Sequence, residues 1–144
     1  MIAFDTNLLV YAHRADSPFH DRASLLLTQA LNGKARWAIP WPCVHEFISV
    51  VTHARIFKQP TPLALALDVI SGIAKLANVQ LLAEDDGYWQ QLIAAATPAR
   101  VQGPMIHDAR IAALCLHHGI AELWSADRDF SRFPGLKVIN PLLG

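Results

Sequence analysis

Four acidic residues stand where apolar segments end or where helices are expected to begin. Asp5 follows the apolar run 2–4, and Asp127 follows the apolar run 120–124 after two small residues. Asp108 and Glu46 are predicted to lie in the first turns of two helices. Carboxylates gathered in one crevice repel one another unless a cation neutralises them. Since no histidine or cysteine stands at ligand spacing, an all-oxygen donor set favours Mg²⁺ or Mn²⁺ over Zn²⁺.

The segment 105–130 carries half of this expected site. Asp108 is predicted to open a helix, because apolar residues recur behind it at helical spacing. The pair His117 and His118, followed by Gly119, is typical of a helix end, where a cationic imidazole meets the negative end of the helix dipole. A buried strand over 120–124 is predicted to follow and to deliver Asp127 to the end of a sheet.

The rest of the chain alternates between strand-like and helix-like patterns. Strands are predicted at 2–4, 37–41, 79–82, 120–124 and 137–140, and helices at 8–13, 18–31, 44–57, 63–76, 87–96 and 108–118. This alternation predicts a three-layer α/β/α domain around a central, mostly parallel sheet of four to five strands. We expect the first strand to be central. In such a sheet the carboxyl ends of the strands converge on one crevice.

Length and composition limit the alternatives. A chain of 144 residues without a linker-like segment is expected to form one domain, residues 1–144. Its 53% hydrophobic content and mean hydropathy of +0.26 are high, so we expect part of the apolar surface to face a partner. Lys+Arg and Asp+Glu number 12 each, so any contact with nucleic acid must come from a local patch. The candidates for such a nucleic-acid phosphate patch lie in or beside the acidic segments: Arg14, Arg110, Arg128 and Arg132.

The chain carries no sign of export or membrane insertion. Cys43 and Cys115 form no C-x-x-C motif, which favours buried thiols in a reducing compartment. The N-terminus lacks a basic region and meets a charge at Asp5. No uncharged apolar run approaches the ~20 residues that span a bilayer. We therefore expect a soluble cytoplasmic protein with no membrane partner.

Each carboxylate also has an ordinary structural explanation. Asp5 and Asp108 could cap helices, Asp127 and Asp129 could be turn residues, and Glu46 could be a solvated helix position. Their convergence on one crevice favours a metal site over five unrelated roles. Apolar neighbours around Glu46 also argue against a charge placed there only for solubility.

Metal-assisted hydrolysis of a phosphodiester fits such a site, because it requires no nucleophilic side chain. The chain has neither a G-x-S-x-G elbow nor a phosphate-binding glycine loop. A phosphatase of the haloacid dehalogenase type, with Asp5 as covalent nucleophile, is an alternative. That chemistry usually needs a second aspartate two residues on, where this chain has Asn7.

Four segments together resemble the PIN-domain ribonucleases, and most of all the VapC-type toxins of bacterial toxin–antitoxin modules. These are M-I-A-F-D-T-N at 1–7, P-x-x-x-x-E-F at 42–47, H-D-A-R-I-A-A-L-C-L-H-H-G at 107–119 and L-W-S-A-D-R-D-F at 123–130. The resemblance covers nearly the whole chain. It implies that the metal-binding and catalytic acids are Asp5, Glu46, Asp108 and Asp127. It also implies Asp129 as an auxiliary acid, and Asn7 and Ser125 as residues that brace the site by hydrogen bonds. One departure is His45, which precedes Glu46 where many relatives carry serine.

The resemblance also implies a biological role. It implies Mg²⁺- or Mn²⁺-dependent endonucleolytic cleavage of RNA, often structured RNA such as tRNA or rRNA. It further implies inhibition by a cognate antitoxin protein and, commonly, a homodimer. A non-catalytic PIN-like scaffold that only binds RNA or a partner is the remaining alternative. The four acids count against it, because a pure binder has no need of a repelling cluster.

Overall fold

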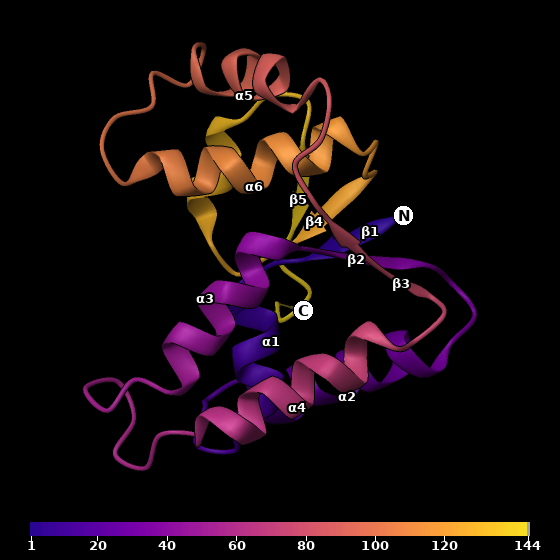
Figure 1. Cartoon of the computed structure of the whole chain (residues 1–144), viewed down its shortest axis with the longest axis vertical. Helices are drawn as coiled ribbons and strands as arrows, with labels where there is room; N and C mark the ends of the chain where they lie inside the picture. The colour runs from indigo at the N-terminus through magenta and orange to yellow at the C-terminus, as the bar shows by residue number, and fades with distance from the viewer. Residues whose placement is uncertain (144) are drawn as a thin grey trace.

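The computed structural model describes residues 1–143, which form one parallel sheet surrounded by helices (Figure 1). Within these residues the strands are β1 (Ile2–Phe4), β2 (Trp37–Pro40), β3 (Val79–Leu82), β4 (Glu122–Trp124) and β5 (Lys137–Ile139). The helices are α1 (Thr6–His13), α2 (His20–Asn32), α3 (Trp41–Val51), α4 (Leu63–Ala74), α5 (Tyr88–Ala96), α6 (Met105–His117) and the 3-10 helix η1 (Arg128–Arg132). The predicted α/β fold with a mostly parallel sheet is confirmed.

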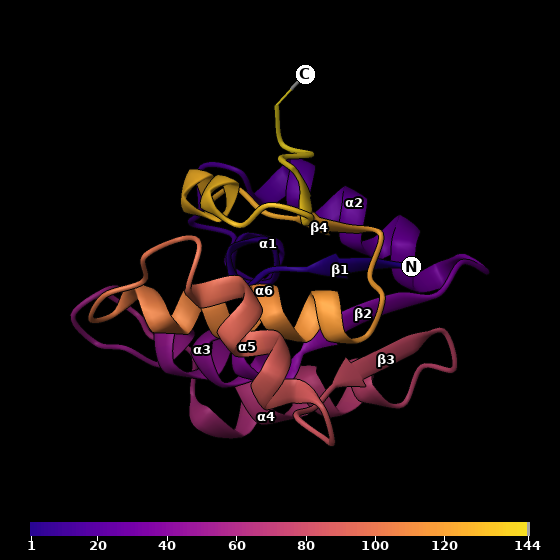
Figure 2. The same cartoon turned by 90° about the horizontal axis from the view of Figure 1, so that it is seen from above.

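The five strands are all parallel and run in the order β3-β2-β1-β4-β5. Figure 2 shows β1 between β4 and β2, so the expected central position of the first strand is confirmed. Ile2 pairs with Trp37 on one side and with Glu122 on the other. Aromatic side chains fill this centre, where the stacked rings of Phe4 and Trp37 have their centroids 4.7 Å apart. Because β1 and β4 are paired and parallel, their carboxyl ends lie side by side.

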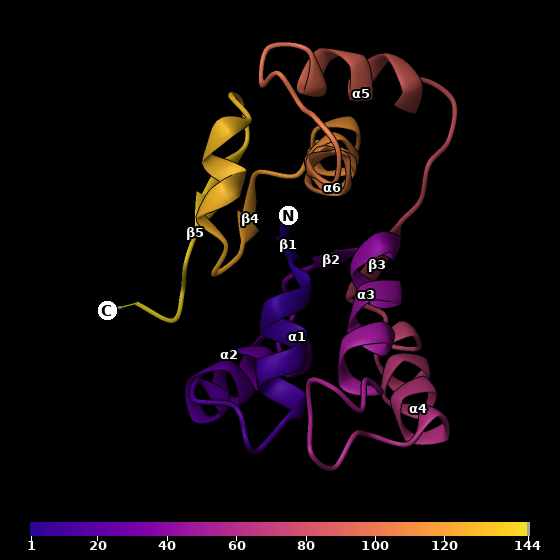
Figure 3. The same cartoon turned by 90° about the vertical axis from the view of Figure 1, so that its left-hand side faces the viewer.

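Helices cover both sides of the sheet. Helices α5 and α6 pack together on one side, while α1, α2 and α4 lie on the other (Figures 1 and 3). Helix α3 leaves the carboxyl end of β2 and contacts α1, α4 and α6, so it joins the two helical layers at that end of the sheet. No helix among residues 1–143 is long and apolar enough to cross a membrane.

Helix α3 differs from its predicted range of 44–57 at both ends. It begins at Trp41, because a proline such as Pro42 is well suited to the first turn of a helix. It ends at Val51, whose carbonyl accepts a hydrogen bond of 2.8 Å from the distant Thr61 amide instead of from the next helical turn. Glu46 consequently lies in the second turn, and its predicted place in the first turn was wrong.

Other boundaries also shift. Helix α2 begins at His20, after a turn in which Ser17 Oγ accepts from the Phe19 amide, and not at the proline before it. Helix α6 begins at Met105, so Asp108 lies within its first turn and does not open it. The short helix η1 was not predicted. It forms because the Asp127 carboxylate caps it, accepting from the Asp129 amide at 2.8 Å.

Candidate metal centre

Asp5 is the most buried of the candidate ligands, with 4% of its surface exposed. It follows β1 and caps α1: Oδ1 accepts from the Thr6 amide at 2.8 Å. Its other oxygen, Oδ2, accepts from Ser125 Oγ at 2.6 Å and from Asn7 Nδ2 at 3.2 Å. Burial raises the pKa of Asp5 from 3.8 to about 6, although the hydrogen bonds from Ser125 and Thr6 oppose this rise. The chain thus holds a carboxylate in a position where its charge is poorly solvated.

Ser125 and Asn7 tie the ends of β1 and β4 together. Ser125 is 1% exposed, and its Oγ donates to Asp5 while accepting from the Asp127 amide at 2.9 Å. Asn7 donates to both Asp5 and Ser125 through Nδ2 and accepts from the Ala126 amide at 3.2 Å through Oδ1. These bonds fix the Asp5 carboxylate and the backbone that carries Asp127 in one rigid unit.

Glu46 and Asp108 complete a single cavity with Asp5 and Asp127. The cavity has a volume of about 210 Å³, and all four carboxylates line it together with Asn7. Glu46 is exposed and accepts from Thr6 Oγ1 at 3.2 Å. Burial first, and then the charges of Asp127, Asp129 and Glu46, raise the pKa of Asp108. The structure therefore brings all four sequence-predicted acids to the carboxyl edge of the sheet.

The expected apolar surroundings of Glu46 were wrong. Val44 and Phe47 are 2% and 0% exposed, but they point into the core while Glu46 faces the cavity. Neighbours in a helix lie on different faces, so apolar residues beside an acid in sequence do not surround it in space.

Asp129 extends the acidic cluster. Ligand oxygens of Asp108, Asp127 and Asp129 lie within 4.8 Å of one another, a spacing that one cation can bridge. Asp129 is exposed and pairs with Arg132 at 3.6 Å. All donors in the cavity are oxygens, which is the donor chemistry that fits Mg²⁺ or Mn²⁺.

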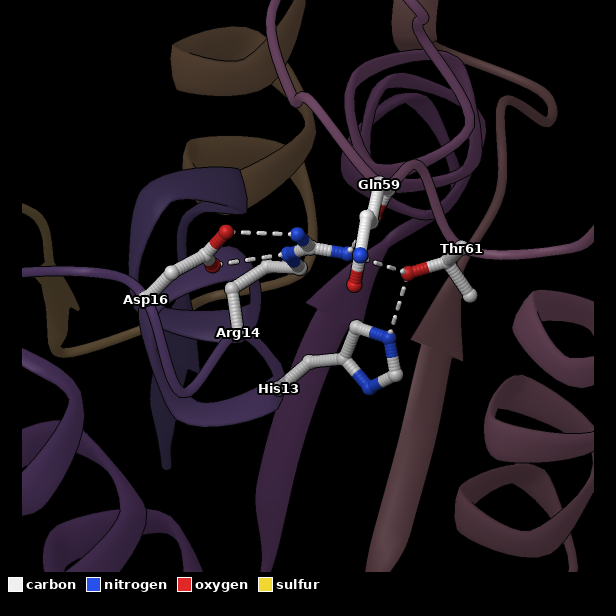
Figure 4. A network of polar contacts seen from close by, with 5 residues as sticks. All are labelled: His13, Arg14, Asp16, Gln59 and Thr61. Atoms are coloured by element: carbon white, nitrogen blue, oxygen red, sulfur yellow. Dashed lines mark hydrogen bonds and ion pairs between the residues drawn. The ribbon is translucent and has the colours of Figure 1, made fainter.

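Arg14 does not lie with the acids. Helix α1 starts at the cavity, and Arg14 caps its far end, about 12 Å along the helix axis. Its guanidinium donates to Asp16, to the Gln59 carbonyl and to Thr61 Oγ1, at 2.6, 2.9 and 3.2 Å. Figure 4 draws these residues, with the contacts to Asp16 and Thr61 as dashed lines. The guanidinium also stacks 4.1 Å from the centre of the Phe57 ring. Its donors are occupied in holding the loop before α4 against α1.

The other three arginines of the predicted phosphate patch lie near the acids. Arg110 pairs with Glu84 and shares a second cavity with Glu46 and Asp108. Arg132 pairs with Asp129. Arg128 is exposed and has no carboxylate partner within 4 Å among residues 1–143. It lines a cavity of about 310 Å³ that opens beside Asp127.

Two residues that contact the site were missed at the level of sequence. Thr6 connects Asp5 and Glu46, donating its amide to the first and its hydroxyl to the second. Its place after Asp5 was a signal for this role. Cys43 lies in the core with Sγ 3.6 Å from Asp5 Oδ1, and no local pattern indicated that contact. Both cysteines are buried and unpaired, as expected.

Comparison with known proteins agrees with this geometry. Residues 2–136 match the PIN domain family. Ribonuclease VapC48 of Mycobacterium tuberculosis is 35% identical over 141 residues, covering 98% of this chain and 97% of the relative. Ribonuclease VapC43 of the same organism is 33% identical over 144 residues, covering 100% and 97%. The chain therefore belongs to the PIN domain family and, within it, to the VapC ribonucleases.

Solved structures share the fold. FitAcB from Neisseria gonorrhoeae superposes with a TM-score of 0.65 at 18% identity, covering 100% of both chains. Mycobacterium tuberculosis VapC20, described as a sarcin-ricin loop cleaving toxin, superposes with a TM-score of 0.62 at 19% identity, covering 91% of this chain and 93% of its own. At these identities the likeness establishes the three-layer architecture.

Proposed function

We propose that this chain, a ribonuclease of the VapC toxin family, hydrolyses RNA phosphodiester bonds with a divalent cation held by Asp5, Glu46, Asp108 and Asp127. The observation that carries this proposal is the single cavity that all four carboxylates line. Burial first, and then neighbouring carboxylates, raise the pKa values of Asp5 and Asp108, so the native fold holds these acids where their charged forms are disfavoured without a cation. When bound there, Mg²⁺ or Mn²⁺ would neutralise the acids, acidify the attacking water and stabilise charge on the phosphate.

The ligands and the residues around them have different roles in this proposal. Asp5 is the fixed ligand, because it accepts hydrogen bonds from the sheet edge, from the start of α1 and from Cys43 of α3. Glu46 is more exposed and can adjust to the cation and substrate. Asn7 and Ser125 orient Asp5, and Asp129 serves as an auxiliary acid beside Asp127. Such fixed ligands reduce the reorganisation that catalysis would otherwise require.

Among the predicted RNA-binding arginines, Arg128 has the strongest support. It is exposed, it lacks a carboxylate partner within the described residues, and it adjoins Asp127. Arg110 and Arg132 would exchange a carboxylate partner for an RNA phosphate. We retain these three as the phosphate patch and assign Arg14 to structural support.

We further propose a cognate antitoxin protein as inhibitor and a homodimer as the free form. The VapC membership supports the first. Exposed apolar side chains support the second: Leu63, Leu65 and Leu67 of α4 are 56%, 49% and 45% exposed. Structured RNA is the proposed substrate class, since the fold relative VapC20 is described as cleaving the sarcin-ricin loop.

Two alternatives make different predictions. A haloacid-dehalogenase-type phosphatase would need Asp5 as a free nucleophile, yet both its oxygens accept hydrogen bonds, and Asn7 stands where that chemistry usually needs a second aspartate. A binding scaffold would retain RNA without cutting it.

One assay separates the three functions. The purified full-length chain is incubated with labelled RNA and with p-nitrophenyl phosphate, in Mg²⁺, Mn²⁺ or EDTA, with Asp108→Asn as the contamination control. We expect cleavage of RNA alone, dependent on the cation and lost in the variant. Undiminished RNA cleavage in excess EDTA, hydrolysis of the phosphomonoester, or RNA retention without cleavage would each refute the proposal.

A further inference from the structure

A second group of metal-ligating side chains lies at the opposite end of α6 from Asp108. His117 is the last residue of this helix and His118 caps it, while Asp85 comes from the segment between β3 and α5. In Figure 1 this segment passes the C-terminal end of α6. Ligand atoms of Asp85, His117 and His118 all lie within 4.8 Å of one another. The site is about 14 Å along the helix from Asp108.

The arrangement of the two imidazoles suits coordination. His118 Nε2 lies 2.8 Å from the Ala83 carbonyl oxygen, which can only accept, so Nε2 carries a proton. The neutral ring therefore presents its lone pair on Nδ1. A backbone carbonyl that holds the distal N–H of a histidine is the usual support of a metal ligand. The two rings are nearly perpendicular, with centroids 4.9 Å apart.

His117 and Asp85 supply the other two donors. His117 Nε2 pairs directly with Asp85 Oδ1. Their side chains are 17% and 60% exposed, so solvent and ions have access to the pair. Gly87 permits the close approach of this loop: its φ is +90°, and a Cβ there would lie 3.3 Å from His117 Cε1.

The local field also favours a cation. The end of α6 presents the negative pole of the helix dipole. Asp86 follows Asp85 and adds negative charge to the same loop, whereas Glu84 is paired with Arg110. Two imidazoles and one carboxylate favour a borderline transition-metal ion over Mg²⁺, which prefers oxygen ligands.

We propose that Asp85, His117 and His118 form a second metal site of the Zn²⁺ class, which links the β3–α5 loop to the end of α6. Zn²⁺ bound to three protein ligands keeps a fourth position for water. On binding, the proton between His117 Nε2 and Asp85 Oδ1 is released to solvent and the ion takes its place, which holds the loop to the helix. The site is separate from the acidic cavity and does not depend on nuclease activity.

The test measures Zn²⁺ binding to the untagged full-length chain by calorimetry. Excess Mg²⁺ and an Asp108→Asn background keep Zn²⁺ from the acidic cavity. We expect one Zn²⁺ per chain, with affinity reduced at least tenfold by His117→Gln, His118→Gln or Asp85→Asn. His53→Gln, which changes an exposed histidine outside the cluster, is the matched control and should bind like the parent.

Two further readouts exclude a purely structural effect. Co²⁺ in place of Zn²⁺ should give a visible absorption band in the parent and in the His53 variant, and none in the His118 variant. Melting in EDTA checks that each variant folds, and Zn²⁺ should raise the melting temperature only where the site is intact. If the parent binds no Zn²⁺ under these conditions, or if the His117 and His118 variants bind it as the parent does, His117 and Asp85 form only a surface ion pair and the proposal is wrong.

Discussion

Ser125 Oγ donates to Asp5 Oδ2 at 2.6 Å and thereby joins the carboxyl ends of β4 and β1. This bond lowers the pKa of Asp5 and so opposes the effect of burial. Both residues are almost completely buried. The bond thus keeps a desolvated carboxylate closer to its ionised form, which is the form that could bind a cation.

Ser125→Ala should shift the pH dependence of RNA cleavage to higher pH, because the pKa of Asp5 rises when this donor is lost. Loss of a buried hydrogen bond should also reduce the free energy of unfolding by about 1–3 kcal/mol. A pH–rate profile and urea denaturation measure the two effects. Ser49→Ala, on the exposed face of α3, is the control and should change neither. An unchanged pH profile in Ser125→Ala would show that the serine does not tune Asp5.

The pH dependence of stability follows from the raised pKa of Asp5, about 6 against 3.8. The folded state binds this proton more tightly, so its contribution is fully present below pH 3.8 and is lost as pH rises through about 6. A shift of this size corresponds to about 3 kcal/mol. In EDTA, the free energy of unfolding of the wild type should therefore fall by up to about 3 kcal/mol relative to that of Asp5→Asn as the pH rises from roughly 4 to 7. A difference that does not vary with pH would mean that Asp5 ionises normally.

The stabilisation of the fold by Mg²⁺ should increase with pH, in contrast to the contribution of the Asp5 proton, which decreases. The cation binds the ionised carboxylates, so the rise in melting temperature that it produces should grow as pH increases through about 6. Melting curves with Mg²⁺ and with EDTA across this range measure the effect. A rise that stays constant with pH would place the cation away from Asp5.

Asp108→Asn should leave the metal-free fold as stable as wild type or more stable, because it removes one of several mutually repelling charges. It should also lose most of the Mg²⁺-induced rise in melting temperature and abolish cleavage. Asp21→Asn is the matched control, since Asp21 also lies in the first turn of a helix but is exposed and outside the cavity. It should cost roughly 0.3–1 kcal/mol through the helix dipole and leave metal response and cleavage intact. If both variants behave alike, Asp108 acts only at the helix terminus.

Arg128→Ala and Arg14→Ala should separate RNA binding from structural support. Loss of Arg128 should weaken RNA binding and make the slope of log K against log salt concentration shallower by about 1, with little change in stability. Loss of Arg14 should lower the free energy of unfolding by about 1–3 kcal/mol, because Thr61 and the Gln59 carbonyl lose their partner. RNA affinity measured over a salt series, with urea denaturation, distinguishes them. Equal RNA-binding defects in both variants would contradict the assignment.

The sequence predicted the sheet and the convergence of the acids because both follow from chain direction. Parallel strands place their carboxyl ends at one edge, so Asp5 and Asp127 had to meet there. Side chains that depend on distant partners were not predictable in this way. Arg14 stands beside a motif in sequence, yet its partners Gln59 and Thr61 lie more than forty residues away, with separations of 45 and 47. The end of α3 at Val51 likewise depends on Thr61, which no local periodicity reveals.

The central position of β1 determines when the acidic cavity can form during synthesis. The shortest hydrogen bond to Asp5 comes from Ser125, which is synthesised 120 positions later. Strand β1 also lacks its β4 neighbour until residues 122–124 have emerged. Contacts of such long sequence separation form late, after loop closure over nearly the whole chain. The acidic cavity of a VapC-type nuclease with this strand order therefore cannot assemble before the segment that carries β4 and Ser125 has been synthesised.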